Sequence, residues 1–104
     1  MLCLDVNEQI VDEALAKGCN LIVSHHPLLF RGLKQVCGAD MVQRTVIKAI
    51  KNDVCVISMH TNMDNAHGGV NWKIGDRLGL KDMQFFAGKT VYGVEAGSGV
   101  IGVL

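Results

Sequence analysis

The sequence has only one proline in 104 residues, Pro27, and no block of like charge. Ten basic residues balance ten acidic ones, which argues against recruitment by charge to nucleic acid or to a membrane surface. No apolar run approaches the roughly 18 residues that a membrane span needs, and no signal peptide is visible. We therefore expect a cytoplasmic protein with neither a membrane nor a nucleic acid as partner.

Closely spaced cysteine pairs are also absent. The cysteines form no C-x-x-C motif and lie far apart, at Cys3, Cys19, Cys37 and Cys55. This pattern favours small buried hydrophobic side chains in a reducing cytosol over disulfides or thiolate ligands. A hydrophobic content of 49% excludes disorder, and the length predicts a single domain over residues 1–104.

Three apolar segments are typical of β-strands: Met1–Leu4, Asn20–Ser24 and Val54–Met59. The first is expected to be short and buried. The third is a continuous run rich in β-branched residues, which indicates a strand covered on both of its faces. Two further strands are predicted in the weakly patterned tail of residues 81–104, at Lys89–Val94 and Gly99–Leu104.

Three other segments have helical periodicity. Asn7 is a good N-cap for the first helix, which Gly18 ends in a left-handed turn. Asp40 is placed to cap the second helix, with Gln43 in the capping-box position. The third helix has apolar residues at four-residue steps over residues 70–78.

The alternation of strand and helix predicts an α/β domain with three layers, a mostly parallel sheet flanked by helices. In such sheets, ligands collect beyond the carboxyl ends of the strands. Each of the three expected strands is followed there by metal-competent residues: Asp5 after the first, His25 and His26 after the second, and His60 and Asp64 after the third. If the strands are neighbours, these groups gather at one edge of the sheet.

The adjacent histidines His25 and His26 are the centre of this candidate site. Pro27 disfavours helix at His26, so the two imidazoles are held on extended backbone. With Asp64 they form a nitrogen and carboxylate donor set that suits zinc, iron or manganese. An exposed His26 and an Asp64 that caps a turn are equally compatible with the spacing. His60 is a third ligand, an acid/base group, or a strand-end histidine bonded to backbone.

Other candidate residues have simple structural explanations. Gly68-Gly69 before a helix could admit a phosphate, but the absence of a P-loop lysine and spacing favours a plain turn. His67 has no partner at a metal-site spacing and is expected to be exposed. Trp72 is most simply a core or subunit contact. Arg31 and Lys34 are either solvated charges or contacts to an anionic substrate.

Four segments together resemble a known family. They are Leu4–Val6, Ser24–Phe30, Lys48–Asp53, and His60–Asp64 followed by Gly68–Asn71. In register from about Leu2 to Leu80, the sequence is similar to the Nif-three-like dinuclear metal-centre proteins, also known as GTP cyclohydrolase I type 2 homologues. The double-histidine motif and the His-Thr-Asn-x-Asp motif together make the resemblance specific.

The resemblance implies the Nif-three-like α/β fold assembled into a hexameric ring, a homo-oligomer with two divalent metal ions in each complete site. Matched residue by residue, His25, His26 and Asp64 correspond to metal ligands, and His60 to a site histidine. The family also has a late His-x-x-x-Glu pair and an early Asp-Asn-x-Gly segment, and neither is present here. The sequence is therefore expected to be an internal or truncated piece of a family member.

Two functions from different classes are compatible with these residues. The first is a metal-dependent hydrolase of a purine nucleotide, as in a GTP cyclohydrolase, or of a phosphoester, with His60 transferring a proton. The second is a non-catalytic metal-binding adaptor or regulator, in which the ions stabilise a ring that docks other proteins. Only the first requires open coordination positions and a substrate pocket.

Overall fold

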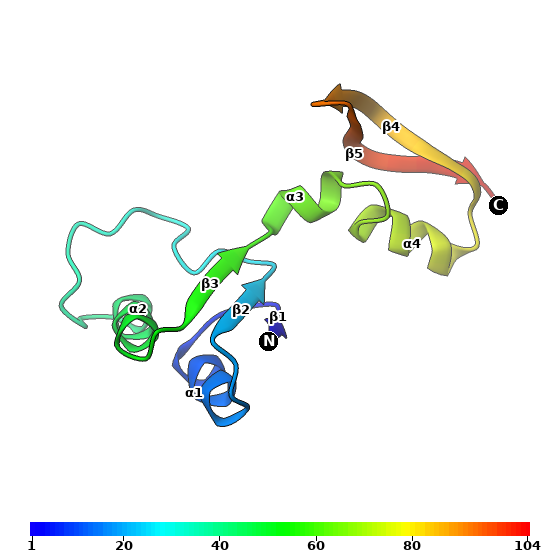
Figure 1. Cartoon of the computed structure of the whole chain (residues 1–104). Helices are drawn as coiled ribbons and strands as arrows, with labels where there is room; N and C mark the ends of the chain where they lie inside the picture. Colours follow the sequence, from blue (N-terminus) through cyan, green and yellow to red (C-terminus); the bar gives the residue numbers. More distant parts are fainter. The chain divides into compact units, whose positions relative to one another are not determined.

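The computed structural model describes the whole chain, from Met1 to Leu104. The chain forms two compact units, Met1–His60 and Thr61–Leu104, and each is described by itself. The first unit contains β1 (Leu2–Cys3), α1 (Glu8–Ala16), β2 (Leu21–Ser24), α2 (Met41–Lys51) and β3 (Cys55–Ser58) (Figure 1). None of the helices has the length and apolar character that a membrane crossing requires.

The first unit is built on a parallel sheet in the order β1-β2-β3. Leu2 pairs with Val23, and Val23 pairs with Ile57, so the three strands run in one register with their carboxyl ends at a common edge. A parallel neighbour must be reached by a crossover, and α1 and α2 provide the two crossovers. The predicted α/β class and the parallel sheet flanked by helices are thus confirmed.

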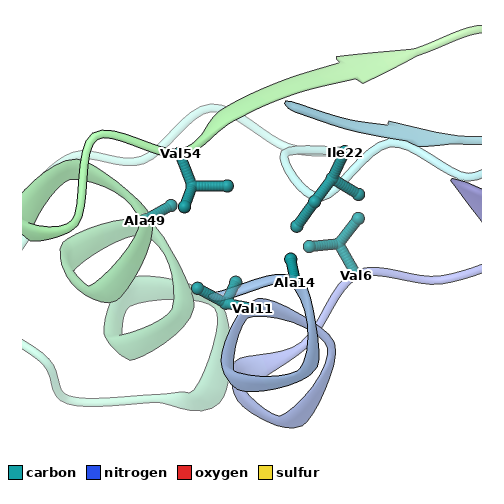
Figure 2. Packing of buried hydrophobic residues seen from close by; sticks show 6 residues of the cluster. All are labelled: Val6, Val11, Ala14, Ile22, Ala49 and Val54. Carbon is teal, nitrogen blue, oxygen red and sulfur yellow. The ribbon is translucent and has the colours of Figure 1, made fainter. Parts of the chain in front are cut away.

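The core of the first unit lies between the two helices and one face of the sheet. Its buried side chains point toward one another in Figure 2: Val6, Val11, Ala14, Ile22, Ala49 and Val54. The predicted N-cap residues are found at the starts of α1 and α2. The Asn7 side chain accepts a hydrogen bond of 3.0 Å from the backbone of Ile10, and Asp40 accepts one of 2.8 Å from the backbone of Gln43.

The opposite face of the same sheet is uncovered. We call it the open apolar face, and its members are Leu2, Leu21, Val23, Cys55 and Ile57. Leu2 is 82% exposed and Ile57 is 49% exposed, so the expectations of a buried first strand and of a third strand covered on both faces are wrong. The reason is chirality. Two right-handed crossovers that advance in one direction along a sheet place both helices on the same side.

The second unit is an antiparallel hairpin with a helix against it. β4 (Lys81–Val91) and β5 (Val94–Val103) pair along their length with an irregularity between Lys81 and Gln84, and α4 (Val70–Leu78) packs on them. The hairpin turn falls at Tyr92-Gly93, where both residues have positive φ, inside one of the expected strands. The predicted strand boundaries in residues 81–104 are therefore wrong, because the extended segments are longer and the turn is a two-residue one.

The aromatic residues of the second unit pack together. The ring of Trp72 lies 5.4 Å from that of Phe85 and 4.1 Å from that of His67, measured between centroids. This confirms the packing role expected of Trp72. His67 is exposed, as expected, and stacks on the indole.

Candidate metal centre

Backbone hydrogen bonds continue the parallel sheet beyond the ends of its strands. The N–H of His26 donates to the carbonyl of Leu4 at 2.9 Å, and the N–H of His60 donates to the carbonyl of His25 at 2.8 Å. These bonds keep the chain segments that follow β1, β2 and β3 side by side. The histidines therefore meet at the carboxyl edge of the sheet, where the sequence placed them.

Three imidazole rings form the centre of this edge. The ring centroids of His25 and His26 are 4.9 Å apart, those of His25 and His60 are 5.8 Å apart, and those of His26 and His60 are 6.4 Å apart. The Phe30 ring lies 6.4 Å from that of His60 and gives the group an apolar neighbour. Imidazole is a ligand type that borderline divalent ions take in proteins.

Two serine hydroxyls hold the backbone under the histidines, and the sequence reading missed them. Ser24 is only 2% exposed, and its hydroxyl donates to the carbonyl of His26 at 2.8 Å. The hydroxyl of Ser58 lies 3.0 Å from that of Ser24 and also donates to the carbonyl of His26 at 3.5 Å. The available signal was that β2 and β3 both end in serine, at paired positions of the sheet.

His60 has an unusual backbone. Its φ is 39°, in the left-handed region that non-glycine residues seldom adopt. This conformation costs a side chain with a Cβ on the order of 1 kcal/mol, and such strain clusters at functional sites. It turns the chain from β3 directly into the short helix α3 (His60–Asn65). The segment that follows the third strand is therefore helical from His60 onward.

Asp5 lies at the same edge and contacts the double histidine. Its Oδ1 is 2.8 Å from Nδ1 of His26. Burial raises the pKa of the Cys3 thiol, and the nearby carboxylate of Asp5 raises it further. A cavity of about 310 Å³ opens beside the pair and is lined by Asp5, Val6, Asn7, His26, Pro27, Leu28, Met41 and Val42.

Asp64, the expected carboxylate ligand, belongs to the second unit. It lies in α3, and its backbone carbonyl accepts a hydrogen bond of 2.8 Å from the side chain of Asn71. Its carboxylate is not engaged in an ion pair or hydrogen bond, so it caps no turn. The Gly68-Gly69 segment is a plain turn, because the N–H of Gly69 is bonded to the carbonyl of Ala66 at 3.0 Å.

The donor types at this edge fit a divalent metal, although no three such groups are assembled around one point. Imidazole and carboxylate are the ligands that zinc, iron and manganese take in proteins. No group of three or more His, Cys, Asp or Glu side chains is arranged so that it could hold a metal ion. All four cysteines are free thiols, and Cys37 and Cys55 are exposed, contrary to the expectation that the cysteines are buried.

Comparison with protein families gives one match over the entire chain. The model of the family described as Duf34/NIF3 (NGG1p interacting factor 3) matches residues 1–104. A Halalkalibacterium halodurans protein named GTP cyclohydrolase 1 type 2 homolog is 42% identical over 90 residues, which are 86% of this chain and 24% of that protein. A Bacillus subtilis protein of the same name is 40% identical over 87 residues, covering 84% of this chain and 23% of the relative.

Solved structures agree with these relatives. A Bacillus cereus protein related to NIF3 superposes with a TM-score of 0.76 at 40% identity, over 86% of this chain and 25% of that one. A Staphylococcus aureus protein superposes with a TM-score of 0.75 at 36% identity, over 85% of this chain and 29% of the other. The chain thus spans about a quarter of the length of the relatives that it matches.

Proposed function

Since the chain belongs to the DUF34/NIF3 family, we propose that it is part of a dinuclear-metal-binding protein, a metal-dependent hydrolase of the GTP cyclohydrolase I type 2 homologue kind. The observation that carries the proposal is the meeting of three imidazoles at the carboxyl edge of a parallel sheet, with centroids 4.9 to 6.4 Å apart. This edge is the usual ligand-binding position in α/β sheets. The relatives' name supports the reaction class.

In this proposal His25, His26 and Asp64 hold two divalent ions of zinc, iron or manganese. When bound, such ions act as Lewis acids that lower the pKa of water and polarise the bond under attack. The three imidazoles are partly exposed, so an ion can reach them from solvent.

His60 is the residue of this chain proposed to move the proton. It lies beside the two expected ligands, and the backbone hydrogen bond to His25 fixes its distance from them. Neutral imidazole can accept a proton from water and return it to a leaving group. In this proposal a purine nucleotide or phosphoester approaches through the cavity of about 310 Å³ that Asp5 and His26 line.

A non-catalytic role as a metal-binding adaptor in a ring is the second candidate. It is favoured by the open apolar face, where Leu2 is 82% exposed and Ile57 is 49% exposed. Monomeric proteins seldom leave such a surface uncovered, and it commonly marks a contact with other polypeptide. In this proposal the complete protein is a homo-oligomer, a hexamer, whose metal ions stabilise the ring.

Metal content of a double variant tests the primary proposal. His25→Ala with His26→Ala should remove most bound zinc, iron or manganese, measured by elemental analysis of the purified chain. The fold should survive, because both rings lie at the sheet edge and outside the core. His67→Ala removes an imidazole from the second unit and should leave the metal content unchanged. Equal metal content in the double variant and the native chain would refute the ligand assignment.

A further inference from the structure

Asp5 and His26 are the one carboxylate and imidazole pair at the candidate centre. The distance of 2.8 Å between Oδ1 and Nδ1 is that of a hydrogen bond. The pair joins the segment after β1 to the segment after β2, and sheet pairing brings those two segments together. Neither His25 nor His60 has a carboxylate within ion-pair distance, so the contact distinguishes His26 from the other two rings.

The backbone holds this pair in place from both sides. The N–H of His26 is bonded to the carbonyl of Leu4, the neighbour of Asp5, at 2.9 Å. The carbonyl of His26 accepts the hydroxyl of the buried Ser24 at 2.8 Å. Pro27 further restricts the backbone at His26. Both backbone groups of His26, its N–H and its carbonyl, are therefore hydrogen-bonded. These bonds fix the backbone that holds the ring beside Asp5.

An ionised carboxylate can only accept hydrogen bonds, so Nδ1 of His26 must carry the proton in the neutral ring. The proton on Nδ1 leaves Nε2 with its lone pair free. In metal sites a carboxylate on the outer nitrogen orients the imidazole and raises its basicity as a ligand. His26 thus has a defined donor nitrogen before any ion arrives.

We propose that Asp5 is a positioning residue that holds His26 in the Nδ1–H tautomer and makes Nε2 the nitrogen offered to the metal. This inference rests on the proposed function for its metal-binding consequence. Its structural part, the tautomer, concerns the metal-free chain alone. Asp5 is 66% exposed and His26 is 47% exposed, so the pair is accessible to solvent and contributes little to folding.

The tautomer is read by long-range ¹H–¹⁵N NMR of the metal-free 104-residue chain with labelled histidine, at alkaline pH where imidazoles are neutral. His26→Gln assigns the signals. The native chain should show His26 protonated on Nδ1. Asp5→Ala should shift His26 toward the Nε2–H form, whereas Asp5→Asn retains an acceptor and should keep much of the native tautomer. An unchanged tautomer in Asp5→Ala, or an Nε2–H ring in the native chain, overturns the proposal.

Cobalt(II) titration followed by absorption spectroscopy measures the consequence. Asp5→Ala should weaken binding about tenfold or more, as loss of such an outer carboxylate does elsewhere, with a smaller loss in Asp5→Asn. Glu13→Ala removes the same charge from the exposed surface of α1 and should have no effect. Equal cobalt affinity in Asp5→Ala and the native chain rules out the positioning role. A native chain that binds no cobalt shows that the ligands of this chain do not hold the metal by themselves, while the tautomer result still decides whether Asp5 orients His26.

Discussion

The backbone N–H of His60 donates a 2.8 Å hydrogen bond to the carbonyl oxygen of His25, so these two residues are neighbours through their main chains. The spacing of their imidazoles, 5.8 Å between centroids, is set by the sheet and needs no contact between the rings. Replacing either side chain should therefore leave the other in place. This separation of scaffold from side chain makes the candidate site suitable for substitution experiments.

His60 and Asp64 should separate catalysis from metal binding in a full-length version of the protein. His60→Gln should lower the rate of nucleotide or phosphoester hydrolysis by about a hundredfold, since a proton carrier acts in the transition state. Metal content should stay nearly constant. Asp64→Ala should lower both together through loss of the ions. Parallel loss of rate and metal in His60→Gln would make His60 a ligand, and absence of turnover by the metal-loaded native protein would favour the adaptor.

The open apolar face should drive self-association of the 104-residue chain. Ile57→Lys places a charge on this face, on the edge strand β3, where the native side chain is 49% exposed. The variant no longer buries this apolar side chain on association, so the dissociation constant for self-association should rise about tenfold or more. Light scattering after size-exclusion chromatography measures the change. Ile50→Lys, a control on α2 where the side chain is 69% exposed, should associate like the native chain. A monomeric native chain would contradict the prediction.

The thiol of Cys3 should react with iodoacetamide only at higher pH than an ordinary cysteine. Burial and the carboxylate of Asp5 raise its pKa, so at a given pH a smaller fraction is the reactive thiolate. Mass spectrometry of the N-terminal peptide gives the rate against pH, with the urea-unfolded chain as control. The pH at which the alkylation rate is half-maximal should be higher in the native chain than in the unfolded chain, and Asp5→Asn should lower it. A midpoint at or below the unfolded value would show that burial does not govern this thiol.

Local signals in the sequence were sufficient for α1, α2 and α4 and for the three strands of the parallel sheet. Asn7 and Asp40 cap helices as predicted, because an N-cap depends on a side chain and the backbone only three residues further on. The placement of His25, His26 and His60 at one sheet edge also followed from strand order alone. In contrast, α3 (His60–Asn65) lacks the apolar periodicity that would predict a helix.

Only the tertiary structure decided which face of the sheet is covered and which groups touch. The continuous apolar run of β3 is compatible with one covered face or with two, and the handedness of the crossovers leaves Ile57 exposed. The contact of Asp5 with His26 depends on β1 and β2 being paired in register, a long-range choice that local patterning does not contain. The sequence alone therefore supplied the donors and their common edge. The pairing of the strands decided which carboxylate orients which imidazole.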